Sequence, residues 1–408
     1  MLFLQAFFFV AYTIAIITCL KVNLTKFEFY TFVFIYSLIA ATLIRIISWD
    51  NLNEPFLGGV DSITYDHYGN LITQKTLSLS SYFNKIREDG FGIDDLGMPA
   101  ILYPVYGLFG PGKLSQNFLI LLNAFAITGC AWRMDGILKY FQIQRKVRKF
   151  SLAVFAFLPF LSLTAGVGLK ENFFLYIIMS GFYYMFRYKV TKDKKYFIYA
   201  FLLSLCTFFF RLATCAMMIL SFFICLISND KNGKYIMKLL GFGSLIGFFL
   251  LSFILLTLFG RNLEAFIAIA EYRTGQVSEG VGSIGQWIIG FLAIFFGPFA
   301  NFSQLSEYAI VHSSGVLLKS VLGFPIIMGI IYYTKNFSYK FFPLLVYFIL
   351  NSLMVVLVGV SLDMRYQIPF YPMVIPYAAK FIQDKSFSQT FYYYILLLFL
   401  LIWFYNLR

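Results

Sequence analysis

The sequence predicts an all-α protein, a polytopic transmembrane helical bundle of about 12 spans. Of its 408 residues, 60% are hydrophobic and only 12% are charged, whereas soluble domains carry about 45–50% apolar and about 25% charged residues. The apolar runs are continuous over the length of a membrane-spanning helix. In the strands of a transmembrane β-barrel, apolar and polar residues alternate instead. The aromatic content of 21% suits lipid-facing and interfacial surfaces. These observations exclude a soluble enzyme, a disordered protein and a nucleic-acid binder.

Apolar runs occur along the whole chain, so we expect a single integral membrane domain over residues 1–408. A span needs about 20 predominantly apolar residues. Two further runs, 98–110 and 286–300, are short and contain Gly and Pro, and we expect them to be re-entrant or interfacial. The expected spans are 2–20, 28–48, 114–131, 151–168, 172–188, 196–210, 212–228, 237–259, 316–333, 341–360, 368–382 and 390–406.

The charge distribution predicts which connections face the cytoplasm. The net charge is +13, and the cations lie in short connections between apolar runs, which is the positive-inside pattern. Residues 133–149 hold six cations and the single acid Asp135, so we expect a cytoplasmic loop there. Segment 49–97 holds eight of the 19 acidic residues and is the expected first outer loop. Segment 260–285 is the expected second outer polar segment.

Ionisable residues gather at the expected outer face. Such residues are costly at membrane depth and usually mark a pathway or a site. Arg211, for example, interrupts the apolar stretch 196–228. The candidate site residues at this face are Asp61, Tyr65, Asp66, Lys170, Glu171, Arg211, Arg365 and Tyr366.

These residue types suit the transfer of a group from a lipid phosphate. The guanidinium fork of Arg binds phosphate oxygens through two hydrogen bonds. A carboxylate on the facing loop could deprotonate an incoming hydroxyl as a general base. A single displacement at an anomeric carbon needs one base and a stabilised phosphate leaving group, and we expect Asp61 to be that base. The cations that could stabilise the leaving group are Lys170, Arg211 and Arg365.

Simpler roles stay open for these residues. The alternatives are solvated loop acids for Asp61 and Asp66, an interfacial ion pair for Lys170 and Glu171, a cluster of backbone carbonyls around Arg211, and snorkelling of Arg365 to the interface.

The sequence requires no cofactor. His67 and His312 are the only histidines and are far apart in the sequence, which argues against a His-based metal site. The acids of the first outer loop could hold Mg²⁺ or Mn²⁺ through oxygen ligands, although their spacing does not demand it. The five cysteines have no CxxC spacing and predict free buried thiols.

Several short motifs follow one another in a characteristic order. Asp61 and Tyr65 stand in the first outer loop, and a Pro- and Leu-rich stretch, 95–110, ends in Phe-Gly. After these come Pro159, Gly166, Gly168, Lys170, Glu171, the lone Arg211 and the late group Arg365, Tyr366 and Pro369. Over about residues 55–215 and the late group, the chain resembles the membrane glycosyltransferases of the C-type superfamily. The likeness is strongest to bacterial members of the mannosyltransferase and aminoarabinose-transferase branch.

The resemblance implies an inverting glycosyltransferase of the bacterial cytoplasmic membrane, with its active site facing the periplasm. It would transfer a sugar from a polyprenyl-phosphate-linked donor to a glycan or lipid-linked acceptor, in the synthesis of cell-surface polysaccharide or glycolipid. The implied fold is a bundle of long helices with a helical cap formed by the outer loop. Asp61 and Asp66 would be the catalytic acids. This chain departs from the pattern in having one extra span before that loop and no second acid directly beside Asp61.

Two other classes of function stay open. A polysaccharide repeat-unit polymerase or ligase would also have many spans and arginines for a lipid pyrophosphate, such as Arg261 and Arg273 in the second outer segment. A lipid-glycan flippase or other transporter would scatter charged residues at the midplane of many helices and often repeat its halves. The observed charge clusters at one face, which favours the enzymes over the transporter.

Overall fold

The computed structural model describes most of the chain. Every regular element in the described residues is a helix, which confirms the predicted all-helical class. The predicted span 237–259, apart from Gly243, and the polar segment 260–285, apart from its last three residues, lie outside the described residues. The described residues are 2–52, 60–75, 78–89, 92–228, 243, 283–297, 307–336, 339–358, 363–385 and 389–407.

Several long apolar helices give the chain the character of a membrane protein. In the described part of the chain, five helical segments are long and apolar enough to cross a membrane. They are Lys26–Ile47, Lys113–Tyr140, Arg145–Gly166, Gly315–Lys335 and Tyr339–Leu357. Each of them overlaps one of the predicted spans.

The first half of the chain contains the predicted outer loop between its long helices. That loop is itself mostly helical. The elements in order are α1 (Leu2–Lys21), α2 (Lys26–Leu52), α3 (Val60–Lys75), α4 (Leu79–Glu88), η1 (Ile93–Asp95), α5 (Gly97–Phe109), α6 (Lys113–Tyr140), α7 (Arg145–Ala156), α8 (Pro159–Gly166), α9 (Glu171–Thr191), α10 (Lys194–Cys206), η2 (Thr207–Phe209) and α11 (Leu212–Ile227).

The second half continues with helices that pack on the first half. The described elements are α14 (Ser283–Phe296), α15 (Glu307–Lys335), η3 (Tyr339–Phe341), α16 (Phe342–Leu357), α17 (Met364–Gln367), η4 (Tyr371–Val374), α18 (Ile375–Asp384) and α19 (Gln389–Asn406).

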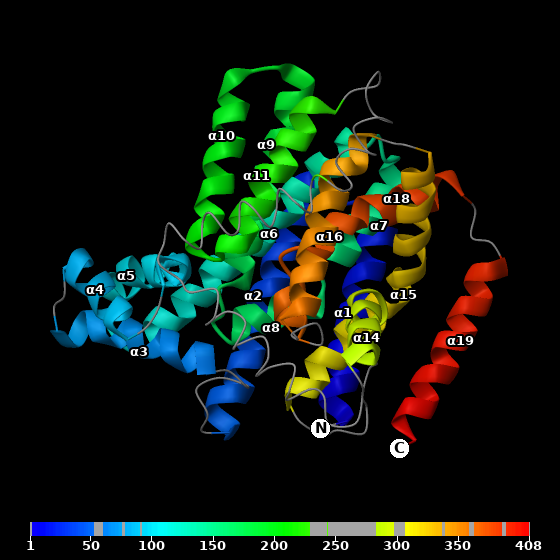
Figure 1. Cartoon of the computed structure of the whole chain (residues 1–408). Helices are drawn as coiled ribbons and strands as arrows, with labels where there is room; N and C mark the ends of the chain where they lie inside the picture. Colours follow the sequence, from blue (N-terminus) through cyan, green and yellow to red (C-terminus); the bar gives the residue numbers. More distant parts are fainter. Residues whose placement is uncertain are drawn as a thin grey trace.

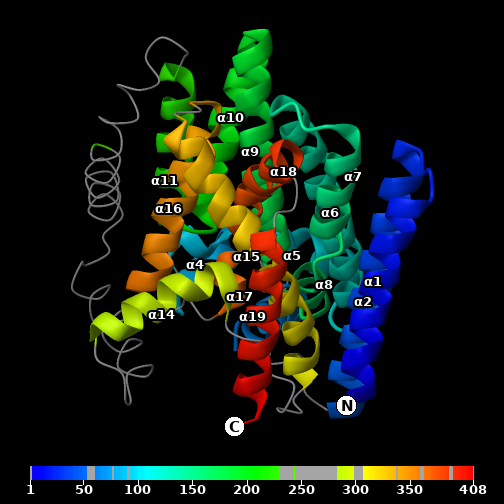
Figure 2. The same cartoon turned by 90° about the vertical axis from the view of Figure 1, so that its right-hand side faces the viewer.

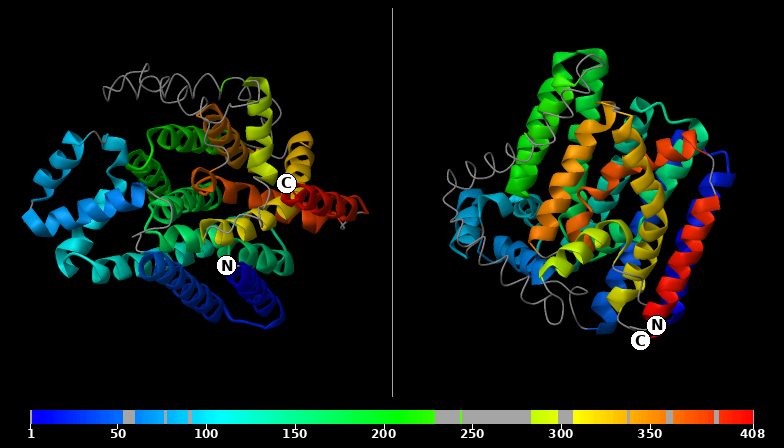
Figure 3. Two further views of the ribbon diagram at one scale, coloured as in Figure 1. Left: turned by 90° about the horizontal axis from the view of Figure 1, so that it is seen from below. Right: turned by 45° about the vertical axis from the view of Figure 1, so that its right-hand side comes forward.

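Helices α3, α4 and α5 form a group at the side of the bundle. Figure 1 shows this group (blue to cyan) away from the tip where α9 and α10 connect, and Figure 3 shows it on the side opposite α19 (red). The group has its own apolar cluster, which includes Tyr65 and Tyr68 of α3, Tyr82 of α4 and Leu102 of α5. The same cluster includes Leu169, so the group is packed onto the turn between α8 and α9.

Helix α5 has the length expected of a segment that does not cross the membrane. Its 13 residues rise about 20 Å at 1.5 Å per residue, whereas the hydrocarbon core is about 30 Å thick. That 98–110 is re-entrant or interfacial stays a prediction.

Residues 133–149 were predicted as a cytoplasmic loop. The prediction of a loop is wrong, because most of these residues are helical. Helix α6 continues to Tyr140 and α7 begins at Arg145. Arg133 and Asp135 are buried. Arg133 donates to Ser180 Oγ at 3.2 Å, and its guanidinium lies 4.6 Å from the ring centre of Trp132. These contacts allow the charge to lie inside the helix packing.

The predicted span 368–382 is not one continuous helix. It is divided into η4 and the ten-residue α18. Pro369, Pro372 and Pro376 fall in this stretch, and each lacks the N–H that an α-helix interior requires. The break leaves α17, with Arg365, as a separate short helix before the apolar segment.

Candidate functional site

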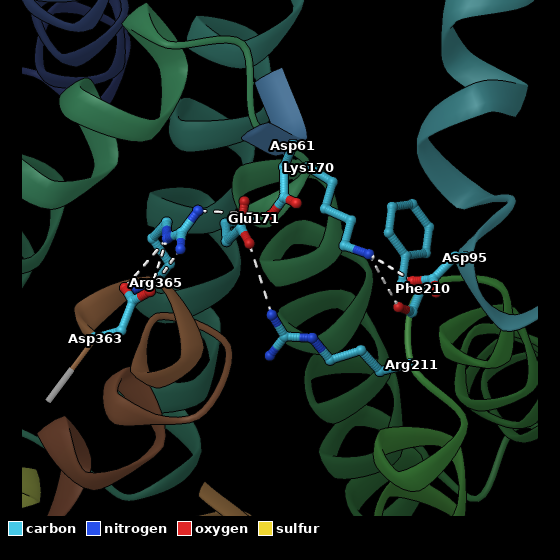
Figure 4. A network of polar contacts seen from close by, with 8 residues as sticks. All are labelled: Asp61, Asp95, Lys170, Glu171, Phe210, Arg211, Asp363 and Arg365. Carbon is cyan, nitrogen blue, oxygen red and sulfur yellow. Dashed lines mark hydrogen bonds and ion pairs between the residues drawn. The ribbon is translucent and has the colours of Figure 1, made fainter. Parts of the chain in front are cut away.

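Five segments that are distant in the sequence meet in one polar cluster. Figure 4 shows that they are α3 with Asp61, η1 with Asp95, the turn before α9, the start of α11, and α17. The cluster contains three cations and four carboxylates. They are Lys170, Arg211 and Arg365, and Asp61, Asp95, Glu171 and Asp363.

Arg365 links α17 to α3. Asp363 holds it through Nε and Nη2, at 2.9 and 2.6 Å from Asp363 Oδ2. On its other side, Nη1 lies 3.5 Å from Asp61 Oδ2. The side chain of Asp61 is 56% exposed, whereas that of Arg365 is 24% exposed. The carboxylate of Asp61 is therefore open to an incoming molecule while it faces a fixed cation.

Arg211 and Glu171 form the centre of the cluster. Arg211 precedes α11 in an extended conformation, and its Nη2 lies 3.6 Å from Glu171 Oε1. Its guanidinium also lies 4.6 Å from the ring centre of Tyr366. Glu171 is 4% exposed, and its second oxygen, Oε2, has no hydrogen-bond partner among the described residues. Arg211 therefore has a carboxylate partner rather than a cluster of carbonyls.

Lys170 is paired with a different segment from its neighbour Glu171. Its Nζ lies 2.9 Å from Asp95 Oδ1 and 3.5 Å from the carbonyl oxygen of Phe210. Burial lowers the pKa of the Lys170 ammonium, but the carboxylate of Asp95 beside it raises that pKa, and the net pKa lies above its usual value. Lys170 therefore stays charged, and no ion pair between Lys170 and Glu171 is present in this described region.

The turn between α8 and α9 is fixed by buried hydrogen bonds of Asn172, the residue after Glu171. Asn172 is fully buried, and its Nδ2 donates to Asn123 Oδ1 of α6 at 3.0 Å and to the carbonyl oxygen of Leu161 at 2.9 Å. Thr164 donates to Asn172 Oδ1 at 3.2 Å. Because Asn172 follows Glu171 directly, these bonds fix where α9 begins and thus where Glu171 lies.

Two glycines let the chain adopt this arrangement. Gly168 has φ +70°, in the left-handed region that side chains disfavour. Gly97 leaves room for the ring of Phe210, since a Cβ there would lie 2.7 Å from that ring. Phe210 can therefore present its carbonyl oxygen to Lys170.

Replacing Gly168 with Ala should lower the free energy of unfolding by about 1–2 kcal/mol, because a Cβ is disfavoured at positive φ. The midpoint of thermal unfolding would measure this loss. Gly107→Ala is the matched control, because Gly107 lies within α5 and a Cβ there would meet no atom within 4 Å among the described residues. Equal midpoints for the two variants would contradict the prediction.

The structure separates Asp66 from the other predicted residues. Asp66 Oδ1 accepts from Tyr106 Oη at 2.6 Å and from Gln116 Nε2, and Oδ2 accepts from Asn70 Nδ2 at 3.1 Å. Gln116 in turn accepts from Arg45 of α2. Asp66 therefore ties α3 to α5 and α6, apart from the cluster around Asp61.

The two predicted tyrosines lie against the cluster. Tyr65 is one helical turn after Asp61 on α3 and is buried. Burial raises the pKa of Tyr65 above its usual value, so it stays protonated. Tyr366 stacks on Arg211, and the guanidinium of Arg365 lies 6.0 Å from its ring centre. Tyr366 therefore helps to orient the two arginines, whereas Tyr65 packs in the apolar cluster beside them.

Lys319, which the sequence analysis did not single out, supports α17 from inside the bundle. It is fully buried in α15. Its Nζ donates to the carbonyl oxygens of Ala293 and Gly297 at 2.6 and 2.9 Å, and to Gln367 Oε1. Three acceptors match the three N–H groups of an ammonium. A lysine alone in the apolar stretch 308–334 was the signal that could have identified it.

The arrangement leaves hydrogen-bonding capacity at the arginines. A guanidinium has five N–H donors. Among the described residues, the one polar contact of the Arg211 guanidinium is the long contact to Glu171, and that of Arg365 Nη1 is the long contact to Asp61. A phosphate oxygen could fill these positions, and Asp61 could accept a proton beside it.

Each carboxylate of the cluster faces a Lys or Arg side chain. In the searched part of the chain, three or more His, Cys, Asp or Glu side chains do not group as metal ligands would. The Mg²⁺ or Mn²⁺ site therefore stays a prediction, and no step below depends on it.

Comparisons with known proteins add no family to this picture, since no family model and no curated protein matches the chain.

Proposed function

We propose that this protein is an inverting membrane glycosyltransferase that uses a polyprenyl-phosphate-linked sugar donor. The acceptor is a glycan or a lipid-linked molecule at the outer face of the cytoplasmic membrane. The observation that carries the proposal is the meeting of three cations with the exposed carboxylate of Asp61 beside apolar helices. In this proposal about 12 helices span the bilayer, and α3, α4 and α5 form a cap over the outer face.

The reaction is a single displacement at the anomeric carbon. The acceptor hydroxyl attacks that carbon while Asp61 takes its proton, so a new C–O bond forms as the bond to the donor phosphate oxygen breaks. The leaving polyprenyl phosphate carries the released electron pair as negative charge. Attack from the face opposite the leaving group inverts the anomeric configuration.

Arg365 and Arg211 stabilise the leaving phosphate. Within the described part of the chain both have N–H donors without a partner, and Arg365 is already oriented by Asp363. Fixed donors near a developing negative charge are worth more than the same donors in water, because they need no reorganisation during the reaction.

Lys170 and Glu171 have supporting roles in this mechanism. Lys170 is occupied by Asp95 and the Phe210 carbonyl, so it contributes positive potential rather than a free donor. Glu171 holds Arg211 from one side and leaves the rest of the guanidinium available.

Transfer by the purified protein in liposomes tests the proposal. The probes are polyprenyl-phosphate-linked sugars labelled in the sugar, with a lipid extract of the source organism as acceptor. We expect labelled product and released polyprenyl phosphate. Arg365→Ala should lower kcat by about 10²–10³-fold, the usual effect of losing one donor to a developing anion.

The control is Arg87→Ala, because Arg87 is exposed on α4 and makes no ion pair among the described residues. It should transfer at the wild-type rate. A ladder of products with increasing repeat number would replace the proposal with a polymerase or ligase. Movement of labelled lipid across the bilayer without bond cleavage would replace it with a transporter.

A further inference from the structure

A basic cavity lies at the far end of α2 from the Asp61 cluster. It has a volume of about 210 Å³ and is formed by the α1–α2 connection together with the starts of α2 and α7. Helix α2 has 27 residues and rises about 40 Å from this cavity to its end, which precedes α3. Figure 2 shows the α1–α2 connection at the end of the bundle opposite both termini. The cavity is therefore separate from the proposed active site.

The charges that line this cavity are mostly positive. They are Lys26, Arg145, Arg148, Lys149 and the single acid Asp135. Asp135 is already shared, because Arg148 Nε lies 3.0 Å from its Oδ1 and Lys139 contacts its Oδ2. The lining therefore carries an excess of positive charge.

The nearby acid Glu28 does not offset this excess. Its Oε2 accepts from the backbone N–H of Thr25 at 2.7 Å, and Thr25 Oγ1 accepts from the N–H of Glu28, so the pair forms a capping box at the start of α2. Glu28 does not line the cavity.

Two of the cations are available to a ligand. Lys149 donates to the carbonyl oxygen of Val22 at 2.7 Å, and Arg148 is held by Asp135. The side chains of Lys26 and Arg145, by contrast, make no hydrogen bond or ion pair within the part of the chain that the structure describes. Both residues are the first of their helices, where unpaired backbone N–H groups add positive potential.

We propose that this cavity binds a phosphate group, and that its occupant is the headgroup of an anionic membrane lipid. Lysine and arginine side chains together recognise phosphate oxygens. Phe29 and Leu152 also line the cavity, and they give the apolar part of a lipid a surface to contact. Pockets for drug-sized ligands have volumes of about 300–1,000 Å³. This cavity is smaller, and its size suits a lipid headgroup.

Native mass spectrometry of the full chain, titrated with phosphatidylglycerol or phosphatidylcholine, tests this site. We expect one phosphatidylglycerol to bind more tightly than phosphatidylcholine. The double variant Lys26→Gln/Arg145→Gln should weaken that binding by about 30-fold, from the usual contribution of two basic residues near an anionic lipid surface. The matched control is Lys146→Gln/Lys194→Gln, which removes the same charge from exposed positions outside the cavity.

Equal binding of the two lipids, or equal binding by the double variant and the wild type, would overturn the proposal. Binding of inorganic phosphate that depends on Lys26 and Arg145, without binding of phosphatidylglycerol, would overturn the lipid as the occupant. Should the double variant melt early, Arg145→Lys keeps the charge and should bind as the wild type does, whereas Arg145→Gln alone should not. None of these results depends on sugar transfer, so they can fail or succeed independently of the proposed function.

Discussion

Replacing Asp61 with Asn should lower kcat for sugar transfer by about 10²–10⁴-fold, the usual contribution of a general base. Asn has the shape of Asp but cannot take the proton of the acceptor hydroxyl. The substitution also frees Nη1 of Arg365, which faces Asp61 at 3.5 Å. We therefore expect the KM for the lipid donor to stay the same or fall while kcat collapses. Initial rates at several donor concentrations, with protein quantified in each preparation, measure both quantities.

The control for Asp61→Asn is Glu88→Gln on α4. The side chain of Glu88 is 69% exposed, and among the described residues it pairs only with Lys85, on the same helix. Surface pairs of this kind contribute little to stability, so Glu88→Gln should leave both kcat and KM unchanged. Wild-type kcat in the Asp61→Asn protein would remove Asp61 from the mechanism.

Replacing Lys319 with Met should cause the largest loss of stability expected here. Met fills a similar volume but donates no hydrogen bond, so the carbonyl oxygens of Ala293 and Gly297 and the side chain of Gln367 lose their donor. The carbonyl oxygen of Ala293 keeps a second donor, the N–H of Gly297 at 3.2 Å, so it is not left bare. Each hydrogen bond removed from a buried acceptor costs about 1–3 kcal/mol where no other donor replaces it. The summed loss is a large part of the about 5–15 kcal/mol that stabilises an ordinary protein.

Thermal unfolding in detergent, followed by circular dichroism, measures this effect. Lys335→Met is the matched control, since Lys335 is exposed in the last turn of the same helix and should tolerate the change. The prediction fails if both variants unfold at the same temperature as the wild type.

The long helices could be predicted because their signal is local. An apolar run such as 28–48 or 114–131 has no stable place in water, and a helix is the way to satisfy its backbone in lipid. The residues at which a helix begins and ends also depend on contacts with other parts of the chain, which the apolar run alone does not reveal. Helix α6 extends past the expected end at 131 because Arg133 finds Ser180 and the ring of Trp132.

The candidate site could be predicted in its members but not in its pairing. Seven of the eight predicted residues lie at one cluster, since polar groups beside apolar helices gather where they can be paired. The exception is Asp66, which was grouped with Asp61 because segment 49–97 was predicted as a loop, whereas both residues lie in helix α3. In a helix, residues five apart point about 140° away from each other, so Asp61 and Asp66 of α3 face different neighbours.

The partners of the site were harder to predict than its cations. Asp363 stands two residues from Arg365, and that spacing could have suggested the pair. Asp95 was one of eight acids in a single segment, and nothing local distinguishes it as the partner of Lys170. Such pairings arise only when η1, the α8–α9 turn and η2 come together in three dimensions.

The way helix α17 is held also determines which substitutions the protein can tolerate. Its four residues are too few to be stable alone, and they are held on one side by Asp363 and Asp61 through Arg365 and on the other by Lys319 through Gln367. In a library of random variants selected for function, substitutions at position 319 and substitutions at position 365 should therefore both be rare. A lineage that changes the buried lysine would have to change its acceptors as well.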